Sequence, residues 1–258
     1  MKKWLIVVST LLVTSSCPAA NHVVLAGSTG TRSGADWSNA CSDLHVDGCS
    51  PLVRGDTYYI GAGTYGNETF SLADSGTTLV TILGATVANH GTVTGWSNNL
   101  SVCTSDGGTQ AQFPNGWTVS TDYWTVDGTC GGGSANNGTT IGYGFRTRSD
   151  RAGSGGVGFQ FQNNVSGITV SHYEIDEVSC CDILTDSPGT DGILCFGACN
   201  VNGTFDHLYI HDVKQTCFLM AGNITVQNSP AGGGSKHLHM QQSEALAKPV
   251  LRRGRAAG

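Results

Sequence analysis

The chain has 258 residues, of which 39% are hydrophobic and 12% are charged, and glycine occupies 37 positions. This length suffices for one sizeable core, and the low charge content excludes long amphipathic helices, so we expect many short strands joined by turns. Residues 21–229 carry 18 acids and six bases, whereas residues 230–258 carry five bases and one acid. The acidic body lacks the basic footprint that nucleic-acid phosphates require, which excludes a nucleic-acid partner.

Residues 1–20 have the pattern of a bacterial signal peptide. Lys2 and Lys3 precede an apolar run over residues 4–13, and small residues follow that run. The run is too short to cross a bilayer, and no later apolar stretch approaches the required length, so no transmembrane segment is predicted. We expect a secreted or cell-surface protein, with Cys17 as an alternative lipid-attachment site.

Short β-branched or aromatic segments bounded by Gly, Asn, Asp and Ser predict the strands. They lie at Thr57–Ile60, Leu79–Leu83, Trp124–Val126, Gly158–Phe161, Ile168–Val170, Tyr173–Ile175, Ile193–Phe196, Leu208–Ile210, Cys217–Met220 and Ile224–Val226. Strands of this length, separated by tight turns, are typical of a parallel β-solenoid, in which each coil is stable only when stacked on its neighbours.

The polar residues between these segments are interpreted as turns. Six Asn-x-Ser/Thr sequences are present, and we expect their asparagines to lie at tight turns, where stacked Asn side chains cap free backbone amides. Arg54-Gly55-Asp56 matches the sequence of an adhesion tripeptide, but it directly precedes a predicted strand and is interpreted as a turn.

Ten cysteines favour disulfides and therefore an oxidising compartment. Cys41 and Cys49 are close enough in sequence for a small loop bridge, and Cys103 with Cys130 is a second candidate pair. The remaining cysteines form a C-terminal cluster with one thiol unmatched: Cys180, Cys181, Cys195, Cys199 and Cys217. A zinc site is the weaker interpretation, because no paired C-x-x-C spacing is present.

The second half of the chain contains an irregular internal repeat. Residues 167–178 are similar to residues 205–213 and 223–228, and residues 123–128 form a fainter copy. Aligning the last aliphatic residue of each copy places Val126, Ile175, Ile210 and Val226 at one position. The unequal spacing predicts loops of variable length between coils.

Three N-terminal motifs resemble the opening of a known superfamily. Residues 35–40 (ADWSNA), 54–65 (RGDTYYIGAGTY) and 81–85 (TILGA) are similar to the first coils of secreted, pectin-lyase-like proteins. The resemblance covers roughly residues 35–229 and implies an all-β fold, a right-handed parallel β-helix with a short N-terminal cap near Trp37. We expect this domain over residues 22–229, between a signal peptide at 1–20 and a tail at 230–258.

If the repeats stack in that alignment, side chains flanking the buried aliphatic residue form two outward columns. The first column holds Asp127, Asp176, His211 and Gln227, and the second holds Thr125, Glu174, Tyr209 and Thr225. His172 and His207 stand beside them. Carboxylates, imidazoles and a phenol on one rigid face suit acid–base chemistry on a sugar polymer, although a solvated polar face is the alternative.

The resemblance implies a polysaccharide lyase acting on a uronate-containing polymer. In such enzymes, acidic ligands hold Ca²⁺, the ion neutralises the uronate carboxylate, and a basic side chain removes the adjacent C5 proton. The candidate Ca²⁺ ligands are Asp127, Glu174 and Asp176. The candidate catalytic residues are Lys214, His211, Arg146 and Arg148, and the candidate substrate-binding residues are Tyr209, His172 and His207.

Two other functions stay open. The segment Ser187–Ile193 resembles the N-T-D-G segment of polygalacturonases with Gly189 in place of the asparagine, which implies a glycoside hydrolase. Asp191 alone cannot supply both the general acid and the general base. A non-catalytic surface or carbohydrate-binding solenoid is the other alternative, because no complete catalytic signature is present.

The tail at 230–258 breaks the strand pattern. A Gly-rich stretch precedes helix-forming residues 240–248 and three arginines. We expect either a linker with a short capping helix or an end that differs from the natural continuation of the solenoid.

Overall fold

The computed structural model describes residues 19–66, 68–130, 142–148, 157–176, 191–195, 199–211, 218–227, 229 and 231–232. The predicted signal peptide and the basic tail lie almost entirely outside the described residues. No helix in the described part of the chain is long and apolar enough to cross a membrane.

Strands dominate the described residues, and the one α-helix, α1 (Val87–His90), is a single turn. The strands are β1 (Asn21–Val24), β2 (Thr57–Ile60), β3 (Gly63–Thr64), β4 (Glu68–Phe70), β5 (Val80–Gly84), β6 (Ala111–Gln112), β7 (Trp117–Val119), β8 (Trp124–Asp127), β9 (Phe145–Arg148), β10 (Val157–Phe161), β11 (Val165–Asp176), β12 (Asp191–Cys195), β13 (Val201–His211), β14 (Phe218–Leu219), β15 (Ile224–Gln227) and β16 (Ala231–Gly232). Short 3-10 turns lie at Trp37–Asn39, Asp47–Cys49, Asn98–Leu100 and Thr104–Asp106.

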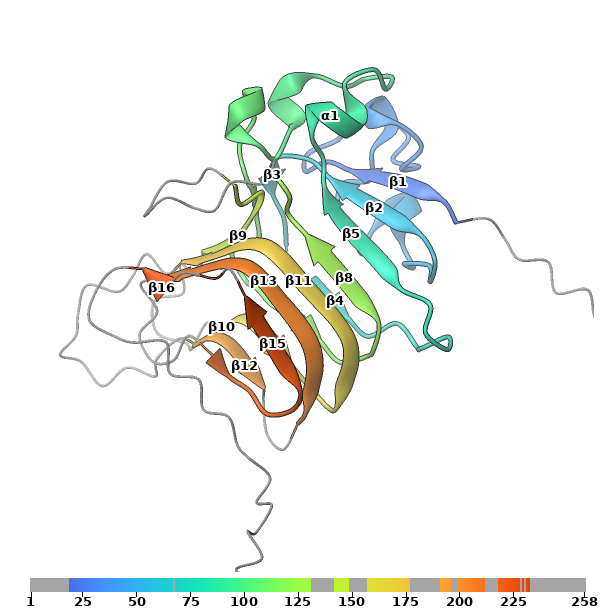
Figure 1. Cartoon of the computed structure of the whole chain (residues 1–258). Coiled ribbons are helices and arrows are strands. Elements are labelled where there is room, and N and C mark those ends of the chain that lie inside the picture. The colour runs from blue at the N-terminus through green and yellow to red at the C-terminus, as the bar shows by residue number, and fades with distance from the viewer. Residues whose placement is uncertain are drawn as a thin grey trace, which may run out of the picture.

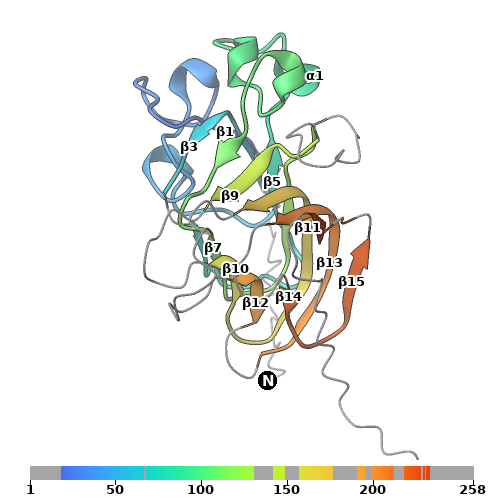
Figure 2. The same cartoon turned by 90° about the vertical axis from the view of Figure 1, so that its left-hand side faces the viewer.

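All pairings between these strands are parallel, and the chain visits three faces in a fixed order. The first face stacks β1, β2, β5, β8, the N-terminal halves of β11 and β13, and β15. The second face stacks β3, β6, β9, the C-terminal halves of β11 and β13, and β16. The third face stacks β4, β7, β10, β12 and β14. Figures 1 and 2 show this winding from two sides. The predicted fold class, an all-β parallel β-helix, is confirmed.

β11 and β13 are much longer than the predicted strands because each passes from the first face to the second without a break. The change of direction falls on His172 and His207, whose φ angles are +49° and +48°. A single left-handed residue rotates the chain sharply while the flanking residues keep their ladder hydrogen bonds. Predicted strands 168–170 and 173–175 are therefore two halves of one element.

Aromatic rings fill the interior. Trp117 packs against Phe70, Phe159 and Tyr173 at centroid distances of 4.8, 5.4 and 5.8 Å. Strand alternation explains this core, because every second residue of each face points inward and stacks on the equivalent residue of the next coil. On the second face, for example, Phe145, Tyr173 and Leu208 occupy one register position, and all three are fully buried.

Asn and Asp side chains join successive coils at the turns. The Asn164 Oδ1 accepts a hydrogen bond from the backbone N–H of Asn200 at 2.9 Å, and Asn202 Oδ1 does the same for Asn223 at 3.1 Å. Earlier in the chain, Asp122 Oδ1 accepts from the Ser166 amide at 2.9 Å. The predicted capping of turn amides by asparagine is thus seen at Asn164, which lies at a turn, and at Asn202, which caps the Asn223 amide from within β13. Aspartate shares this role.

The segment Arg54-Gly55-Asp56 is part of this turn framework. The Arg54 guanidinium donates to the carbonyl oxygens of Leu72 and Asp122 at 2.8 and 2.7 Å, and it lies over the Trp124 ring at 4.8 Å. Its side chain is only 7% exposed. Arg54 is therefore unavailable for adhesion and ties three turns together.

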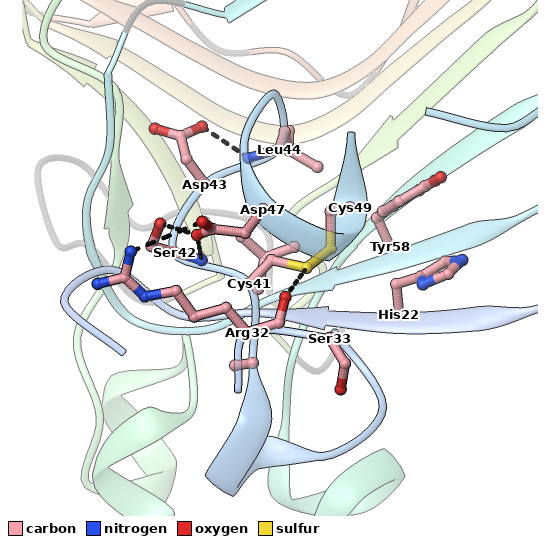
Figure 3. Close-up of a disulfide and its surroundings, with 12 residues drawn as sticks. His22, Arg32, Ser33, Cys41, Ser42, Asp43, Leu44, Asp47, Cys49 and Tyr58 are labelled. Carbon is pink, nitrogen blue, oxygen red and sulfur yellow. Dashed lines mark hydrogen bonds and ion pairs between the residues drawn. A yellow bond between two sulfur atoms is a disulfide. The ribbon is translucent and has the colours of Figure 1, made fainter. Parts of the chain in front are cut away.

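A disulfide between Cys41 and Cys49 closes the loop at the N-terminal end, as predicted (Figure 3). The loop is further held by Asp47, which accepts hydrogen bonds from Ser42 and pairs with Arg32 at 3.6 Å. Gly34 packs tightly against this bridge, since a Cβ there would lie 2.9 Å from the Cys41 sulfur. Together with the turn at Trp37, this loop forms the predicted N-terminal cap.

The other predicted pair, Cys103–Cys130, also forms a disulfide, and the C-terminal cluster contributes Cys195–Cys199. Cys180, Cys181 and Cys217 lie outside the described residues. Three disulfides are typical of proteins that mature in an oxidising compartment.

Candidate functional site

The register of the sheet corrects the predicted columns. Asp127 lies opposite Ser171 on the first face, whereas Asp176 and His211 lie opposite each other on the second face. The predicted column of Asp127, Asp176, His211 and Gln227 therefore mixes two faces: Asp176 and His211 are neighbours as predicted, whereas Asp127 and Gln227 belong to the first face. β11 and β13 each contain two similar segments, one before the bend on the first face and one after it on the second. The alignment on the last aliphatic residue matched Val126 and Val226 of the first face with Ile175 and Ile210 of the second.

The second predicted column is correct only for its middle pair. Glu174 and Tyr209 occupy adjacent coils at one register position, and Arg146 precedes them at the same position. Thr125 and Thr225 belong to the first face, where Thr169 and Thr204 lie between them. Base, acid and phenol thus follow each other along the second face.

Glu174 is the centre of a hydrogen-bonded group. Its Oε2 accepts a hydrogen bond from Gln110 Nε2 at 2.6 Å, and its Oε1 lies 3.0 Å from His211 Nε2. The Arg146 Nε lies 3.7 Å from the same Oε1. With Tyr143 and Tyr209 these residues form what we call the Glu174 cluster.

Burial and hydrogen bonding compete at this carboxylate. Glu174 is only 3% exposed, and burial acts to raise its pKa. The hydrogen bonds from His211 and Gln110, with the nearby charge of Arg146, outweigh burial and hold the pKa of Glu174 below its ordinary value. Glu174 is therefore ionised at neutral pH and fixes the groups around it.

Two tyrosines cover the cluster from outside the solenoid. The rings of Tyr143 and Tyr209 stack at 5.8 Å, and Tyr209 also stacks on the His211 ring at 4.2 Å. Gln110 Nε2 donates a second hydrogen bond to the Tyr143 carbonyl oxygen at 2.9 Å, which joins the chain before β6 to the chain before β9. Although Glu174 and Tyr209 point outward, both are buried, so they do not belong to a solvated polar face.

A second polar group lies at the bends, beside the first. The His172 Nδ1 is 2.8 Å from Asp127 Oδ1 and 3.1 Å from Thr129 Oγ1. In the next coil, His207 Nδ1 is 2.9 Å from Asp206 Oδ1. Sequence reasoning grouped the two histidines correctly but assigned Asp127 to a different partner.

The remaining predicted site residues either lie on different faces of the β-helix or lie outside the described part of the chain. Lys214 lies outside the described residues, as do the side chains of Arg148 and Asp176. Asp127 and Glu174 stand on different faces, and the described residues contain no group of three or more His, Cys, Asp or Glu side chains suited to a metal ion. The structure therefore does not bring the described carboxylates together, and a Ca²⁺ site that uses Asp176 stays a prediction.

Two residues of the Glu174 cluster were not predicted. Gln110 ends the long insertion between β5 and β6, and Tyr143 precedes β9. Neither residue belongs to a repeat or motif. The only sequence signal was the length of the insertion between β5 and β6, which indicates a segment able to cover part of the second face.

The chain matches no protein-family model, no curated protein and no solved structure. Its function must therefore be inferred from the fold and from the two polar groups on its outer surface.

Proposed function

We propose that the chain is an exported protein of the pectin-lyase-like type that cleaves a uronate-containing polysaccharide by β-elimination. The single observation that carries this proposal is the position of the Glu174 carboxylate, which lies 3.0 Å from His211 Nε2 and 3.7 Å from Arg146 Nε on the outer face of the β-helix. The predicted signal peptide and the disulfides support export. The three N-terminal motifs support the family.

The roles follow from the chemistry of elimination. The C5 proton of a uronate is acidified when the charge of its carboxylate is neutralised, and Arg146 supplies a positive charge beside Glu174. When His211 is neutral and donates its Nε2 proton to Glu174, the ring carries its lone pair on Nδ1, which can accept the C5 proton. The C5 electron pair then forms the C4=C5 double bond, the C4–O bond breaks, and the departing oxygen takes a proton from the imidazolium or water.

Tyr209 and Glu174 act as positioning residues in this scheme. The Tyr209 ring stacks on the His211 ring, and the Glu174 carboxylate receives its Nε2, so the imidazole is fixed from two sides. His211 and Arg146 have side chains that are 13% and 16% exposed, and through these edges a polymer would reach the cluster.

A non-catalytic binding solenoid is the second candidate, and one observation favours it. Glu174 and Tyr209 are nearly inaccessible, and a buried ion cluster can serve to hold an insertion against a sheet. A hydrolase has less support, because its mechanism requires two carboxylates and, among the side chains that the structure describes, Glu174 supplies the only one in the cluster.

The test is an activity assay with pectate, alginate and glycosaminoglycans, each with Ca²⁺ or with a chelator. The ultraviolet absorbance of the new C=C bond and the number of reducing ends are measured separately. We expect absorbance to rise with at least one polymer and to be lost in His211→Gln and Arg146→Gln. Loss with the chelator would add the predicted Ca²⁺ ion to the mechanism.

The matched control is His22→Gln. His22 Nε2 lies 2.9 Å from Asp56 Oδ2, which is a histidine–carboxylate pair of similar geometry at the other end of the first face. This variant should retain activity. Reducing ends without absorbance would support the hydrolase, and binding without either product would support the non-catalytic solenoid.

A further inference from the structure

Gln110, the last residue of the insertion between β5 and β6, joins two parts of the Glu174 cluster. It is only 5% exposed, so it offers no surface to a polymer. Its amide nitrogen Nε2 carries two hydrogens and has two acceptors, the Glu174 Oε2 at 2.6 Å and the Tyr143 carbonyl oxygen at 2.9 Å. Both donors of the amide are therefore engaged inside the protein.

The first hydrogen bond fixes the orientation of the Glu174 carboxylate. The terminal torsion of a glutamate side chain has only a broad preference, so a contact is needed to select one orientation. Gln110 holds Oε2, and the other oxygen, Oε1, then faces His211 Nε2 at 3.0 Å and Arg146 Nε at 3.7 Å. Gln110 thereby determines which carboxylate oxygen His211 meets.

The second hydrogen bond reaches the same imidazole by another route. It holds the backbone of Tyr143, whose ring stacks on the Tyr209 ring at 5.8 Å. The Tyr209 ring in turn stacks on the His211 ring at 4.2 Å. Two series of contacts thus begin at the amide of Gln110, and both end at His211, one at the edge of its ring and one at its face.

The backbone on either side of Gln110 is held in place. The Gly108 N–H donates to the Cys103 carbonyl oxygen at 3.2 Å, and Cys103 is joined to Cys130 by a disulfide. A Cβ on Gly108 would collide with the carbonyl oxygen of Ser101. On the other side, the Ala111 N–H donates to the Gly144 carbonyl oxygen at 2.8 Å. The end of the insertion therefore presents Gln110 from a fixed position.

We infer that Gln110 is a positioning residue for the elimination: it holds the His211 imidazole with Nε2 against Glu174, which leaves Nδ1 for the C5 proton. The inference rests on the proposed function, in which His211 is the base. Gln110 acts through Glu174 and the two tyrosines and does not touch the polymer.

The kinetic test uses Gln110→Met, which has a similar size and no donor. On a polymer that the natural protein cleaves, we expect kcat to fall about 100-fold, the effect of displacing a reacting group by about 1 Å. KM should stay unchanged, because Gln110 is buried. Gly108→Ala displaces Gln110 from outside the cluster and should also lower kcat. Combined with Gln110→Met it should add little further loss, because both changes act through one contact.

A second readout does not require activity. In protein labelled with ¹⁵N at histidine, the ring signals of His211 are assigned by their loss in His211→Gln. Gln110→Met should shift or broaden these signals. The matched control is Gln160→Met, since Gln160 is half-buried on β10 of the third face, beside Thr118 and Leu194. It should leave kcat and the His211 signals unchanged. Thermal melts verify that each variant folds.

Unchanged His211 signals in Gln110→Met would overturn the inference, and so would altered signals with an unchanged kcat. A rise in KM at constant kcat would also overturn it, because Gln110 would then contribute to binding of the polymer. If the natural protein cleaves no polymer, the proposed function fails, whereas the His211 signals still decide whether Gln110 orients the imidazole. The two failures are therefore distinguishable.

Discussion

Glu68 carries a buried carboxylate on β4, the first strand of the third face. Its side chain is 0% exposed, and its Oε2 lies 3.0 Å from the Nε2 of His45. Burial raises the pKa of Glu68 to about 7 from the ordinary 4.5, although the nearby His45 imidazole acts in the opposite direction. The folded protein therefore holds this proton more tightly than the unfolded chain does.

The magnitude follows from the two pKa values. The difference between about 7 and 4.5 corresponds to roughly 3 kcal/mol, since one pKa unit is worth about 1.4 kcal/mol. Below pH 4.5 the carboxyl is protonated in both states and costs nothing. Between pH 4.5 and about 7 the unfolded chain ionises first, so stability falls as pH rises, and above pH 7 the full cost remains.

Glu68→Gln removes this titration while preserving shape and a hydrogen-bond donor toward His45. We expect the variant and the natural protein to be about equally stable near pH 4, and the variant to be more stable by roughly 2–3 kcal/mol at pH 8. Urea unfolding from pH 4 to 8 measures the difference in free energy of unfolding. Asp74→Asn is the control, since Asp74 is 42% exposed and its difference from the natural protein should not follow this curve.

The reasoning would be refuted if the stability of Glu68→Gln, measured as the difference in free energy of unfolding from the natural protein, were lower at pH 8 than at pH 4. Such a result would mean that Glu68 is ionised in the folded state and that its ion pair with His45 outweighs the cost of burial.

Three further predictions concern the framework. Arg54→Lys should lower the free energy of unfolding by about 2 kcal/mol in urea titrations, because lysine cannot reach the several carbonyl oxygens that the guanidinium binds. Burial lowers the pKa of His90 to about 4, so the folded state resists protonation and stability is lost as pH falls from 6.5 to 4; His90→Phe should make thermal melts less sensitive to acid in this range. Cys41→Ser with Cys49→Ser should cost roughly 2–3 kcal/mol, the loop-closure value for so short a loop, and an unchanged melting temperature would contradict it.

The fold was predictable where strands are long enough to show their pattern. Thr57–Ile60 is a strand with the predicted bounds, and its alternation of buried and half-buried residues matches one sheet face. β3 and β6 have two residues each, too few to show any periodicity. Those strands exist because neighbouring coils supply their hydrogen-bond partners: β3 pairs with β6, and β6 pairs also with β9. A local window of sequence contains no information about these partners.

The bends were not predictable, because the residue that makes them is unusual there. Turn chemistry points to asparagine or glycine at a left-handed position, and the chain places His172 and His207 there instead. The interactions that compensate are tertiary: the two rings stack on each other, and the His172 ring binds Asp127 of the preceding coil. Because the sequence did not predict the bend, the alignment of the repeats placed Asp127 and Asp176 in one column although they lie on different faces.

The Glu174 cluster shows how an outward position of a solenoid becomes a site. Alternation along β11 sends Tyr173 and Ile175 into the core, so Glu174 must point outward. An outward carboxylate is ordinarily solvated, yet Glu174 is buried because the insertion that ends at Gln110 lies over it. The stacked coils fix which side chains are neighbours, and the insertion removes water from them. A long insertion beside mixed charged and aromatic register positions is therefore the combination by which such a site is recognised on a β-helix.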